Sequence, residues 1–499
     1  MSDNAYSFLA LAVYLLGMLA IGYWAYRRTV DLGDYMLGGR GLGPAVSALS
    51  AGASDMSGWL LLGLPGAVYV SGLDAAWIAV GLTIGAWLNW KYVAPRLRTY
   101  TQVSNNSITV PSFFENRLKD RSRLLRVVSG LIILLFFTFY VSSGMVAGGL
   151  FFESAFGTGY HSGMLLVGAV VVAYTLFGGF LAVSYTDFVQ GTIMLLALVL
   201  VPLLGLFLTG GLGETGESIR SAQPDGLSMF AGVTVLGVIS AGAWGLGYFG
   251  QPHIIVRFMA LRGPGEARSA RRIGIGWMVV SLLGAVATAL VGIAYFRQTS
   301  GATLDDPEAV FIALGQVIFH PLIAGVILAA VLAAIMSTIS SQLLVSSSAL
   351  VEDLYKAVFK TDASDRQLVL LGRLAVLAIS LVATVLAWER STTVLELVAY
   401  AWAGFGASFG PVILLSLYWR RLTATGALAG MITGAVTVVV WGNVEALTST
   451  MYEIVPGFVL NLLVTVVVSR LTYRPQPRIE EEFDESLALL EPAYSPAER

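Results

Sequence analysis

The chain is a succession of long apolar runs separated by short polar segments. A helix needs roughly 17 to 25 mostly apolar residues to cross a bilayer. Thirteen runs are long enough, at about residues 6–26, 43–66, 73–95, 125–151, 161–180, 188–210, 230–250, 273–296, 317–347, 369–388, 393–419, 424–443 and 452–470. The pattern predicts an all-α polytopic membrane protein, and the odd number of spans places the two termini on opposite sides.

The basic residues of the loops indicate which terminus lies outside. Short cytoplasmic loops of membrane proteins are enriched in Lys and Arg. With the N-terminus outside, 26 of the 29 basic residues fall on the cytoplasmic side, among them Arg257, Lys360 and Arg499. The three on the outside are Arg220, Arg297 and Arg390. Since a missed or surplus span would destroy this asymmetry, the charges support both the count and the orientation, with the C-terminus inside.

Composition narrows the class of protein. Of the 499 residues, 56% are hydrophobic and 12% are charged, and the mean hydropathy is +0.77, as expected for a polytopic membrane protein. The net charge of −2 and the lack of a long basic tract argue against a nucleic-acid partner. With no cysteine and three scattered histidines, we expect neither disulfides nor a zinc or redox centre, and no enzyme activity.

One predicted span is interrupted by small and polar residues. Residues 50–59 read Ser-Ala-Gly-Ala-Ser-Asp-Met-Ser-Gly-Trp and carry a single carboxylate, Asp55, near the middle of the span. At that depth, irregular backbone and ionisable groups persist only where they face the protein interior or a watery cavity, and they usually mark a substrate or ion path. This stretch therefore indicates a transporter.

A second span is interrupted at residues 242–252, where glycines at 242, 245, 247 and 250 would let backbone or ligand approach closely. Trp244 and Tyr248 lie four residues apart, and hence on one helical face. The two breaks fall in spans two and seven. This spacing is expected for a substrate site between two inverted repeats of five helices each.

Span nine carries a cluster of hydroxyl groups within residues 333–341. Ser337 and Ser341 are i, i+4 neighbours with Thr338 beside them, so hydroxyls gather on one face of an otherwise apolar helix. Hydroxyl and carbonyl oxygens suit a hard monovalent cation such as sodium.

Five segments together resemble the sodium/solute symporter family. They are Leu37-Gly-Gly-Arg40, residues 50–59, 244–252 and 333–341, and the run Tyr400-Ala-Trp-Ala-Gly-Phe-Gly406. The resemblance extends from about residue 6 to residue 469, and within the family the chain most resembles the bacterial members that take up proline. It implies a leucine-transporter-type fold with an extra first helix (6–26), a first repeat at about 43–210, a second at about 230–419, and two further helices within 424–470. Residues 1–470 would then form a single transmembrane domain, followed by a cytoplasmic tail at 471–499.

The resemblance also implies a sodium site. Its ligands would be the carbonyl oxygens of Ala53, Met56 and Ala334 and the hydroxyls of Ser337 and Thr338. Unwinding of the helix at the first break would free such carbonyls. Asp55 would add negative charge nearby, or organise the break by accepting backbone N–H bonds. The sequence leaves open whether it binds sodium directly.

The resemblance further implies a binding site for L-proline. Its residues would be Ser57, Trp59, Tyr140, Trp244, Tyr248 and Pro252. Aromatic faces can enclose a pyrrolidine ring and attract its ammonium group, while hydroxyls and free N–H groups at helix ends can bind the carboxylate. Arg40 and Asp187, which the sequence places at cytoplasmic ends of helices, are implied in sodium coupling and inward release.

Several of these residues also have a purely structural interpretation. Asp55 could cap a helix end, and Ser337 and Thr338 could bond to carbonyls of their own helix or support helix packing. The aromatic residues could serve in packing or in the interfacial belt, and Arg40 could be a positive-inside anchor.

The sequence thus predicts a multi-pass secondary transporter of the bacterial inner membrane that couples inward sodium movement to the uptake of L-proline. Its partners would be sodium, the solute and the lipid bilayer, with no obligatory protein partner. A sodium symporter for another small solute and a transporter-like solute sensor remain open, whereas a channel would need a continuous polar pore. Because the tail lacks a repeating apolar pattern, we expect no second domain there.

Overall fold

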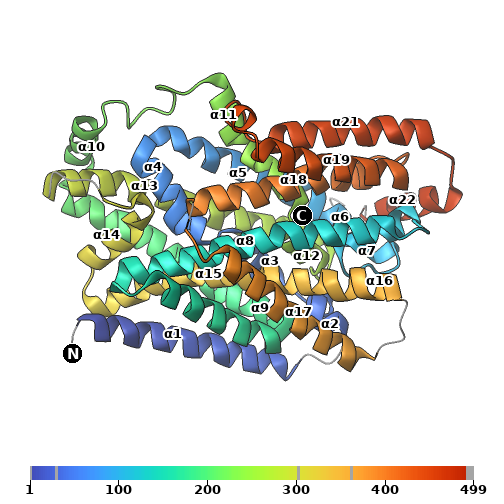
Figure 1. Cartoon of the computed structure of the whole chain (residues 1–499), viewed down its shortest axis with the longest axis horizontal. Helices are drawn as coiled ribbons and strands as arrows, with labels where there is room; N and C mark the ends of the chain where they lie inside the picture. The colour runs from blue at the N-terminus through green and yellow to red at the C-terminus, as the bar shows by residue number, and fades with distance from the viewer. Residues whose placement is uncertain (1–2, 29–31, 300–303, 360–363, 391, 491–499) are drawn as a thin grey trace.

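The computed structural model describes residues 3–28, 32–299, 304–359, 364–390 and 392–490. Lys360 and Arg499, which the charge pattern assigns to the cytoplasmic side, lie outside these residues. In the described part of the chain the regular elements are all helices, apart from one isolated bridge between Leu42 and Leu261. Many of the helices run along the long axis of the molecule (Figure 1).

The elements follow one another without a large irregular insertion. The first are α1 (Asp3–Tyr26), α2 (Leu32–Leu37), η1 (Gly38–Arg40), α3 (Pro44–Asp55), η2 (Trp59–Gly63), α4 (Leu64–Ser71), η3 (Leu73–Ala76), α5 (Trp77–Leu88), η4 (Asn89–Val93), α6 (Ala94–Val103), α7 (Val110–Leu118), α8 (Leu124–Phe156), α9 (Tyr160–Leu208) and α10 (Gly211–Ala222). They are followed by α11 (Val235–Gly242), η5 (Ala243–Gly250), α12 (Pro252–Met259), η6 (Pro264–Glu266), α13 (Ala267–Thr299), η7 (Pro307–Ala309), α14 (Val310–Ile318), α15 (Pro321–Ser348), η8 (Ala349–Tyr355) and α16 (Lys356–Phe359). The last are α17 (Asp365–Leu386), α18 (Val394–Tyr418), α19 (Ala424–Gly442), α20 (Glu445–Thr448), α21 (Ile454–Thr472) and α22 (Pro477–Ala488).

Within the described residues, nine helices are long and apolar enough to cross a membrane. They are Ala5–Tyr26, Leu124–Phe156, Gly179–Leu208, Pro264–Thr299, Pro321–Tyr355, Arg366–Leu386, Val394–Tyr418, Ala424–Gly442 and Ile454–Thr472. Each matches one of the thirteen predicted runs. The other four runs correspond to helices that are shorter or interrupted, among them Trp59–Ser71, Tyr160–Leu176 and Val235–Gly250. The all-α membrane architecture is therefore as predicted, while the count of thirteen spans and their orientation stay predictions.

The helix α15 lies at the centre of the helical assembly. It packs against α1, α3, α8, α9 and α17, and 83% of its apolar window is buried. Its sequence is apolar on nearly all sides, as expected for a helix without a solvent-facing stripe. Consequently the hydroxyl groups of α15 are buried, and several of them bond either to a neighbouring helix, as Ser347 does at Gly372 O, or to a carbonyl of α15 itself, as Ser340 does at Ser337 O.

The helix α9 contains a turn at Gly179. Its backbone (φ 60°, ψ −162°) is one that residues with a side chain rarely adopt, and a Cβ at this position would come within 2.7 Å of the Tyr35 ring. The long segment Gly179–Leu208 begins at this turn. Asp187 therefore lies about two turns inside a helix and is fully buried, which corrects the expectation that it sits at a helix end.

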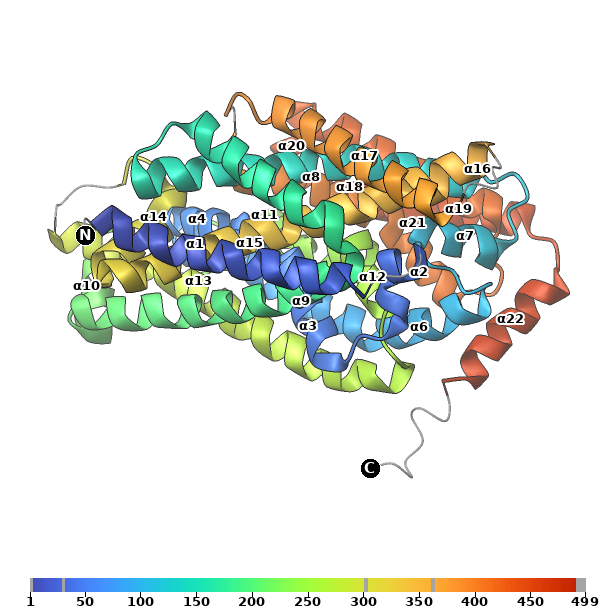
Figure 2. The ribbon, with the colours of Figure 1, turned by 90° about the horizontal axis from the view of Figure 1, so that it is seen from below.

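The tail forms an amphipathic helix, α22, that lies at the end of the molecule holding α6 and α7 (Figure 2). Ile479 and Phe483, four residues apart, are both buried. The Phe483 ring lies 6.0 Å from the Tyr100 ring, and the guanidinium of Arg117 lies 5.4 Å above it. The apolar spacing in this tail was therefore missed at the sequence level. The tail is too short to form a hydrophobic core of its own, so its buried residues pack against α6 and α7.

Replacing Phe483 by Ala should release α22 from the body of the protein. Truncation of a buried Phe typically costs about 3–5 kcal/mol, which exceeds what the remaining exposed ion pairs can supply. Limited trypsin digestion should then cleave after Arg478 at least fivefold faster than in the unmodified protein. Leu489→Ala is the matched control because that side chain is 46% exposed. Equal cleavage rates in both variants would contradict the docking.

Candidate functional site

The helix α3 ends where the sequence predicts the first break. Its last residue is Asp55, and Met56 takes a non-helical conformation (φ −82°, ψ 79°) before η2 begins at Trp59. The N–H of Ser57 donates to the Asp55 carbonyl at 3.0 Å, whereas a continuous helix would direct it to Ala53. The break thereby releases the Ala53 carbonyl from the hydrogen-bond ladder of the helix.

Two hydroxyls of α15 contact the released carbonyl. Ser337 Oγ donates to Ala53 O at 2.7 Å, and Thr338 Oγ1 lies 3.5 Å from the same oxygen. Both hydroxyls also contact the Ala334 carbonyl, at 3.1 Å and 3.2 Å respectively. Four of the five oxygens predicted to bind sodium thus lie together. Met56, which would supply the fifth, is fully buried at the end of the same helix.

These oxygens fit a small hard cation. Carbonyls and hydroxyls are the ligands that such cations prefer, and a hydroxyl can rotate its proton away to offer a lone pair. All the contributing residues are at most 1% exposed, so water does not compete for them. Asp55 Oδ1 is also buried and has no hydrogen-bond partner in the described part of the chain, which leaves negative charge unmatched at this break.

Asp55 connects the first break to the second. Tyr248 Oη of η5 donates a hydrogen bond to Asp55 Oδ2. The Asp55 backbone carbonyl accepts from Trp59 Nε1 at 3.2 Å and from Tyr140 Oη of α8 at 3.4 Å. Among the described residues the carboxylate therefore contacts a tyrosine hydroxyl rather than the backbone N–H groups that the sequence suggested.

The second break consists of the 3₁₀ helix η5 and the extended residue Gln251 (φ −78°, ψ 108°), after which α12 begins. A Cβ at Gly245 would lie 2.2 Å from Gly81 O of α5, and one at Gly247 would lie 1.9 Å from Trp402 Nε1 of α18. These glycines therefore allow two neighbouring helices to approach closely. Their presence is explained without a ligand.

Aromatic rings gather between the two breaks. The ring centroids of Trp59 and Trp244 are 6.3 Å apart, and those of Tyr248 and Trp402 are 5.1 Å apart. Trp402 Nε1 donates to Trp244 O at 2.7 Å. These rings and that of Tyr140 are at most 6% exposed, so the predicted aromatic residues lie in the interior and not in an interfacial belt.

The remaining predicted substrate residues are Ser57 and Pro252. Ser57 is buried in the first break, and its hydroxyl is 3.4 Å from the Trp59 backbone nitrogen. Pro252 is the first residue of α12 and lines a small cavity together with residues of α15. The structure thus places Ser57 beside Trp59 of the aromatic group, whereas Pro252 lines a cavity that contains none of these aromatic residues.

Arg40 binds three segments together. Its guanidinium donates to Met259 O at 2.7 Å, Ser107 O at 2.8 Å and Thr101 Oγ1 at 3.2 Å. Partial burial and the nearby Arg98 lower the pKa of Arg40 to about 10, so it stays charged at neutral pH. Arg40 therefore fixes the end of α12 and is more than a lipid-facing anchor.

Arg257 is a buried ion-pair partner and not a cytoplasmic loop residue. It lies in α12, and its Nη2 is 3.1 Å from Asp187 Oδ2, with both side chains fully buried. Ser50 Oγ donates to the same carboxylate oxygen at 2.7 Å, and Arg257 Nη2 donates to Ser341 Oγ at 2.6 Å. This corrects the assignment of Arg257 made from the charge pattern. A charge enters the interior only with its partners, and these come from three other helices.

Sequence reasoning missed four residues of this region: Ser50, Asn89, Arg257 and Trp402. Trp402 lies within the run 400–406 that contributes to the family resemblance, and Ser50 is the first residue of the interrupted stretch 50–59. Asn89 Nδ2 donates to Tyr248 O at 2.8 Å and helps to hold η5 in place. For Asn89 the only signal was a polar residue inside an apolar run.

Comparison with known proteins identifies related sequences. The chain matches the profile described as "Sodium:solute symporter family" over residues 35–434. It is 63% identical over 468 residues to the "High-affinity proline transporter PutP" of Bacillus subtilis, covering 94% of this chain and 98% of the relative. It is 50% identical over 492 residues to a "Sodium/proline symporter" of Staphylococcus aureus, covering 96% of each. These relatives are transporters, which confirms the expectation that the chain is a membrane transporter and not an enzyme.

Solved structures identify the fold. A Na⁺-coupled sialic acid symporter superposes with a TM-score of 0.80 at 19% identity, covering 94% of this chain and 98% of that one. A nucleobase-cation-symport-1 family transporter superposes with a TM-score of 0.57 at 14% identity, covering 91% and 99%. The predicted leucine-transporter-type fold is thereby confirmed.

The Asp187–Arg257 pair should be coupled in its effect on stability. Asp187→Asn leaves a buried guanidinium without its counter-charge, a change that costs about 3–5 kcal/mol. We expect a clear fall in the thermal unfolding temperature of the detergent-solubilised protein, followed by tryptophan fluorescence. The double variant Asp187→Asn/Arg257→Gln should lose less than the sum of the two single variants. Strictly additive losses would show that the pair is not a unit.

Proposed function

The chain belongs to the sodium:solute symporter family, and we propose that it takes up L-proline together with sodium across the bacterial inner membrane. The two relatives above are named for proline transport, and each aligns with this chain over nearly its whole length. The observation that carries the proposal is the convergence of the Ala53 carbonyl with the hydroxyls of Ser337 and Thr338 beside a buried group of aromatic rings.

Sodium is assigned to the junction of α3 and α15. Its ligands are the carbonyls of Ala53, Met56 and Ala334 and the hydroxyls of Ser337 and Thr338. The two hydroxyls that now contact Ala53 O would turn their lone pairs toward the ion, so that α3 and α15 are held together through it. The free Oδ1 of Asp55 supplies negative charge near the ion in an interior where charges are poorly screened.

L-proline is assigned to the aromatic group between the breaks. Its residues are Ser57, Trp59, Tyr140, Trp244, Tyr248 and Pro252. Indole and phenol faces enclose the pyrrolidine ring and attract the secondary ammonium. The carboxylate is matched to the Ser57 hydroxyl and to the N–H groups at the start of η2, where the helix dipole favours negative charge.

Sodium binding and proline binding are coupled because both proposed sites use residues of the same helix break. Ala53 on the sodium side and Ser57 and Trp59 on the proline side lie within seven residues of one another. An ion that fixes the end of α3 also fixes the groups that receive the solute. Tyr248 gives a second connection, because it faces the solute site and contacts Asp55. A potential of 100 mV supplies about 2.3 kcal/mol per sodium, enough for roughly a 50-fold concentration ratio of the solute.

Purified protein in liposomes should accumulate labelled proline only when sodium is higher outside. An inward sodium gradient is expected to raise the initial rate at least tenfold over potassium medium, with scintillation counting of filtered liposomes as the measurement. Uptake independent of sodium would reject the coupling. Sodium-dependent uptake of a different small solute, with no proline uptake, would reject the substrate.

Ser337→Ala should weaken sodium binding in particular. Losing one oxygen ligand is expected to raise the half-saturation concentration for sodium at least tenfold, while the rate at saturating sodium changes less. Asp55→Asn should act in the same direction, through loss of charge. Ser380→Ala is the control, because that buried hydroxyl bonds to Val376 O within its own helix. A normal sodium response in both Ser337→Ala and Asp55→Asn would remove the proposed site.

A further inference from the structure

A small internal cavity lies between α12 and the end of α15, beside the start of α7. Its volume is about 20 Å³, room for about one water molecule. Pro252 and Val256 of α12 line one part of it, and Ser348 and Asp353 line another. Asp353 is the only charged residue among the fourteen lining residues, all from the described part of the chain. Pro252, which is assigned to the proposed proline site, and the buried carboxylate Asp353 therefore line the same cavity.

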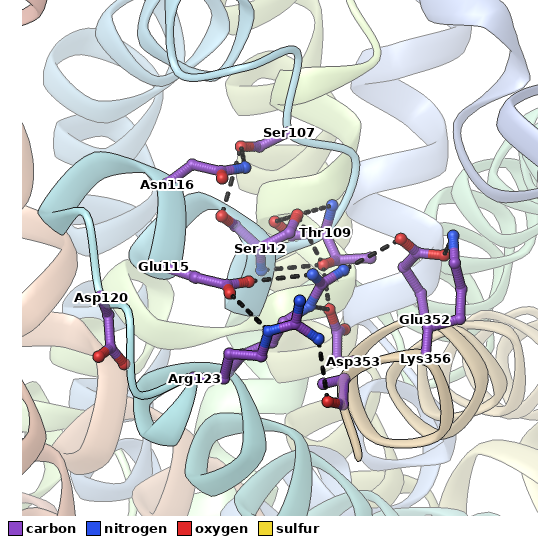
Figure 3. Close-up of polar contacts among 12 residues, drawn as sticks. Ser107, Thr109, Ser112, Glu115, Asn116, Asp120, Arg123, Glu352, Asp353 and Lys356 are labelled. Carbon is purple, nitrogen blue, oxygen red and sulfur yellow. Dashed lines mark hydrogen bonds and ion pairs between the residues drawn. The ribbon is translucent and has the colours of Figure 1, made fainter. Parts of the chain in front are cut away.

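Asp353 belongs to an ion-pair cluster contributed by three elements. Arg126 of α8 contacts Glu115 of α7 at 2.9 Å, and Glu352 and Asp353 of η8 at 3.0 Å each. Figure 3 shows Glu115, Glu352 and Asp353 converging from α7 and η8. Lys356 adds a contact to Glu352 at 2.8 Å. We call Arg126, Glu115, Glu352 and Asp353 the Arg126 cluster; the charge pattern of the loops places it at the cytoplasmic end.

The two oxygens of Asp353 differ in their surroundings. Oδ1 accepts from Arg126 Nε at 3.0 Å and from Thr109 Oγ1 at 2.8 Å. Oδ2 is buried and has no hydrogen-bond partner within the described residues, and the side chain is fully buried. An unmatched carboxylate oxygen in the interior costs free energy, and such a group in a folded protein calls for an explanation. Because Asp353 lines the cavity, an occupant of the cavity can supply the missing partner.

A free carboxylate oxygen beside an otherwise uncharged cavity favours a cation. A sodium ion or a solute ammonium that leaves the helix breaks gives up its ligands before it reaches cytoplasmic water. In a lining that is otherwise uncharged, Asp353 Oδ2 is the atom that can replace them. Arg123 and Lys356 add contacts to Glu115 and Glu352, so the cluster is balanced in charge, yet Asp353 Oδ2 itself receives no hydrogen bond from the described residues.

We propose that Asp353 is a transient binding station for the monovalent cation leaving toward the cytoplasm, either sodium or the secondary ammonium of the solute. The proposal rests on the proposed function above and adds to it a residue on the release path. The station is distinct from the sodium site at Ala53 and from the aromatic group.

The cluster also links the station to movement of α7. Thr109 caps the start of α7, where its hydroxyl accepts from Ser112 N at 3.1 Å, and Glu115 lies on the same helix. A displacement of α7 would withdraw Thr109 from Asp353 and Glu115 from Arg126 together. The Asp353 carboxylate would then have more of its charge available to the leaving cation.

Asp353→Asn tests the station because it keeps the side-chain shape and removes the charge. In inside-out membrane vesicles, we expect the half-saturation concentration at the cytoplasmic face to rise at least fivefold, measured for sodium at fixed proline and for proline at fixed sodium. If the half-saturation concentration for sodium rises, the cation is sodium, and if that for proline rises, the cation is the solute ammonium. In right-side-out vesicles both constants should stay within twofold. If the single variant does not reach the membrane, Asp353→Asn/Arg126→Gln removes the paired charges together and should show the same inner shift.

Glu352→Gln is the matched control. It removes another bond to the same guanidinium, but Glu352 does not line the cavity, so both inner constants should stay within twofold. Unchanged inner constants in Asp353→Asn, or an equal shift in Glu352→Gln, overturn the station. Absence of sodium-dependent proline flux in the unmodified protein would instead reject the proposed function.

Discussion

A backbone carbonyl released inside a membrane protein has no water to bind, and the centre of this structure is organised by that constraint. The break at Asp55 frees the Ala53 carbonyl, and hydroxyls of α15 that lie 284 and 285 residues away in the chain contact it. A break in α3 is therefore tolerated only while α15 stays beside it. A cation at the same oxygens would replace the hydroxyl contact by a stronger electrostatic one. Binding of the ion would therefore also hold α3 against α15.

Small residues bring the second break close enough to take part. At Gly245 a side chain would collide with α5, and at Gly247 it would collide with α18. Because glycine has no side chain, η5 can pack closely against both helices. This close packing brings the Tyr248 hydroxyl to the Asp55 carboxylate and the Trp244 ring beside Trp59. Close backbone packing by small residues is the usual means of helix association where lipid removes the hydrophobic driving force. Here it also positions the aromatic walls of the candidate site.

Two groups of buried charges bring helices together in the interior. Asp187 is matched by Arg257 and by the Ser50 hydroxyl, and its guanidinium partner is in turn bound by Ser341. Asp353 is likewise bonded at one oxygen, by Arg126 and Thr109, and both carboxylates leave their other oxygen without a partner among the described residues. The first arrangement ties four helices together at one depth. The second joins α7, α8 and η8 beside a small cavity.

The sequence by itself determined the features that depend on local composition: the apolar runs, the two breaks, the hydroxyl face of α15 and the family resemblance that grouped the site residues. Helix length and polarity within one run are readable because the bilayer imposes them on each segment separately. Only the tertiary structure decided the partners. It shows that Arg257 is buried in the interior, that Asp187 lies within a helix, and that the tail packs against α6. It also shows that Trp402 and Asn89 belong to the candidate site. Each of these depends on a contact between segments far apart in the chain, and a pattern read along one segment holds no information about which distant segment packs against it.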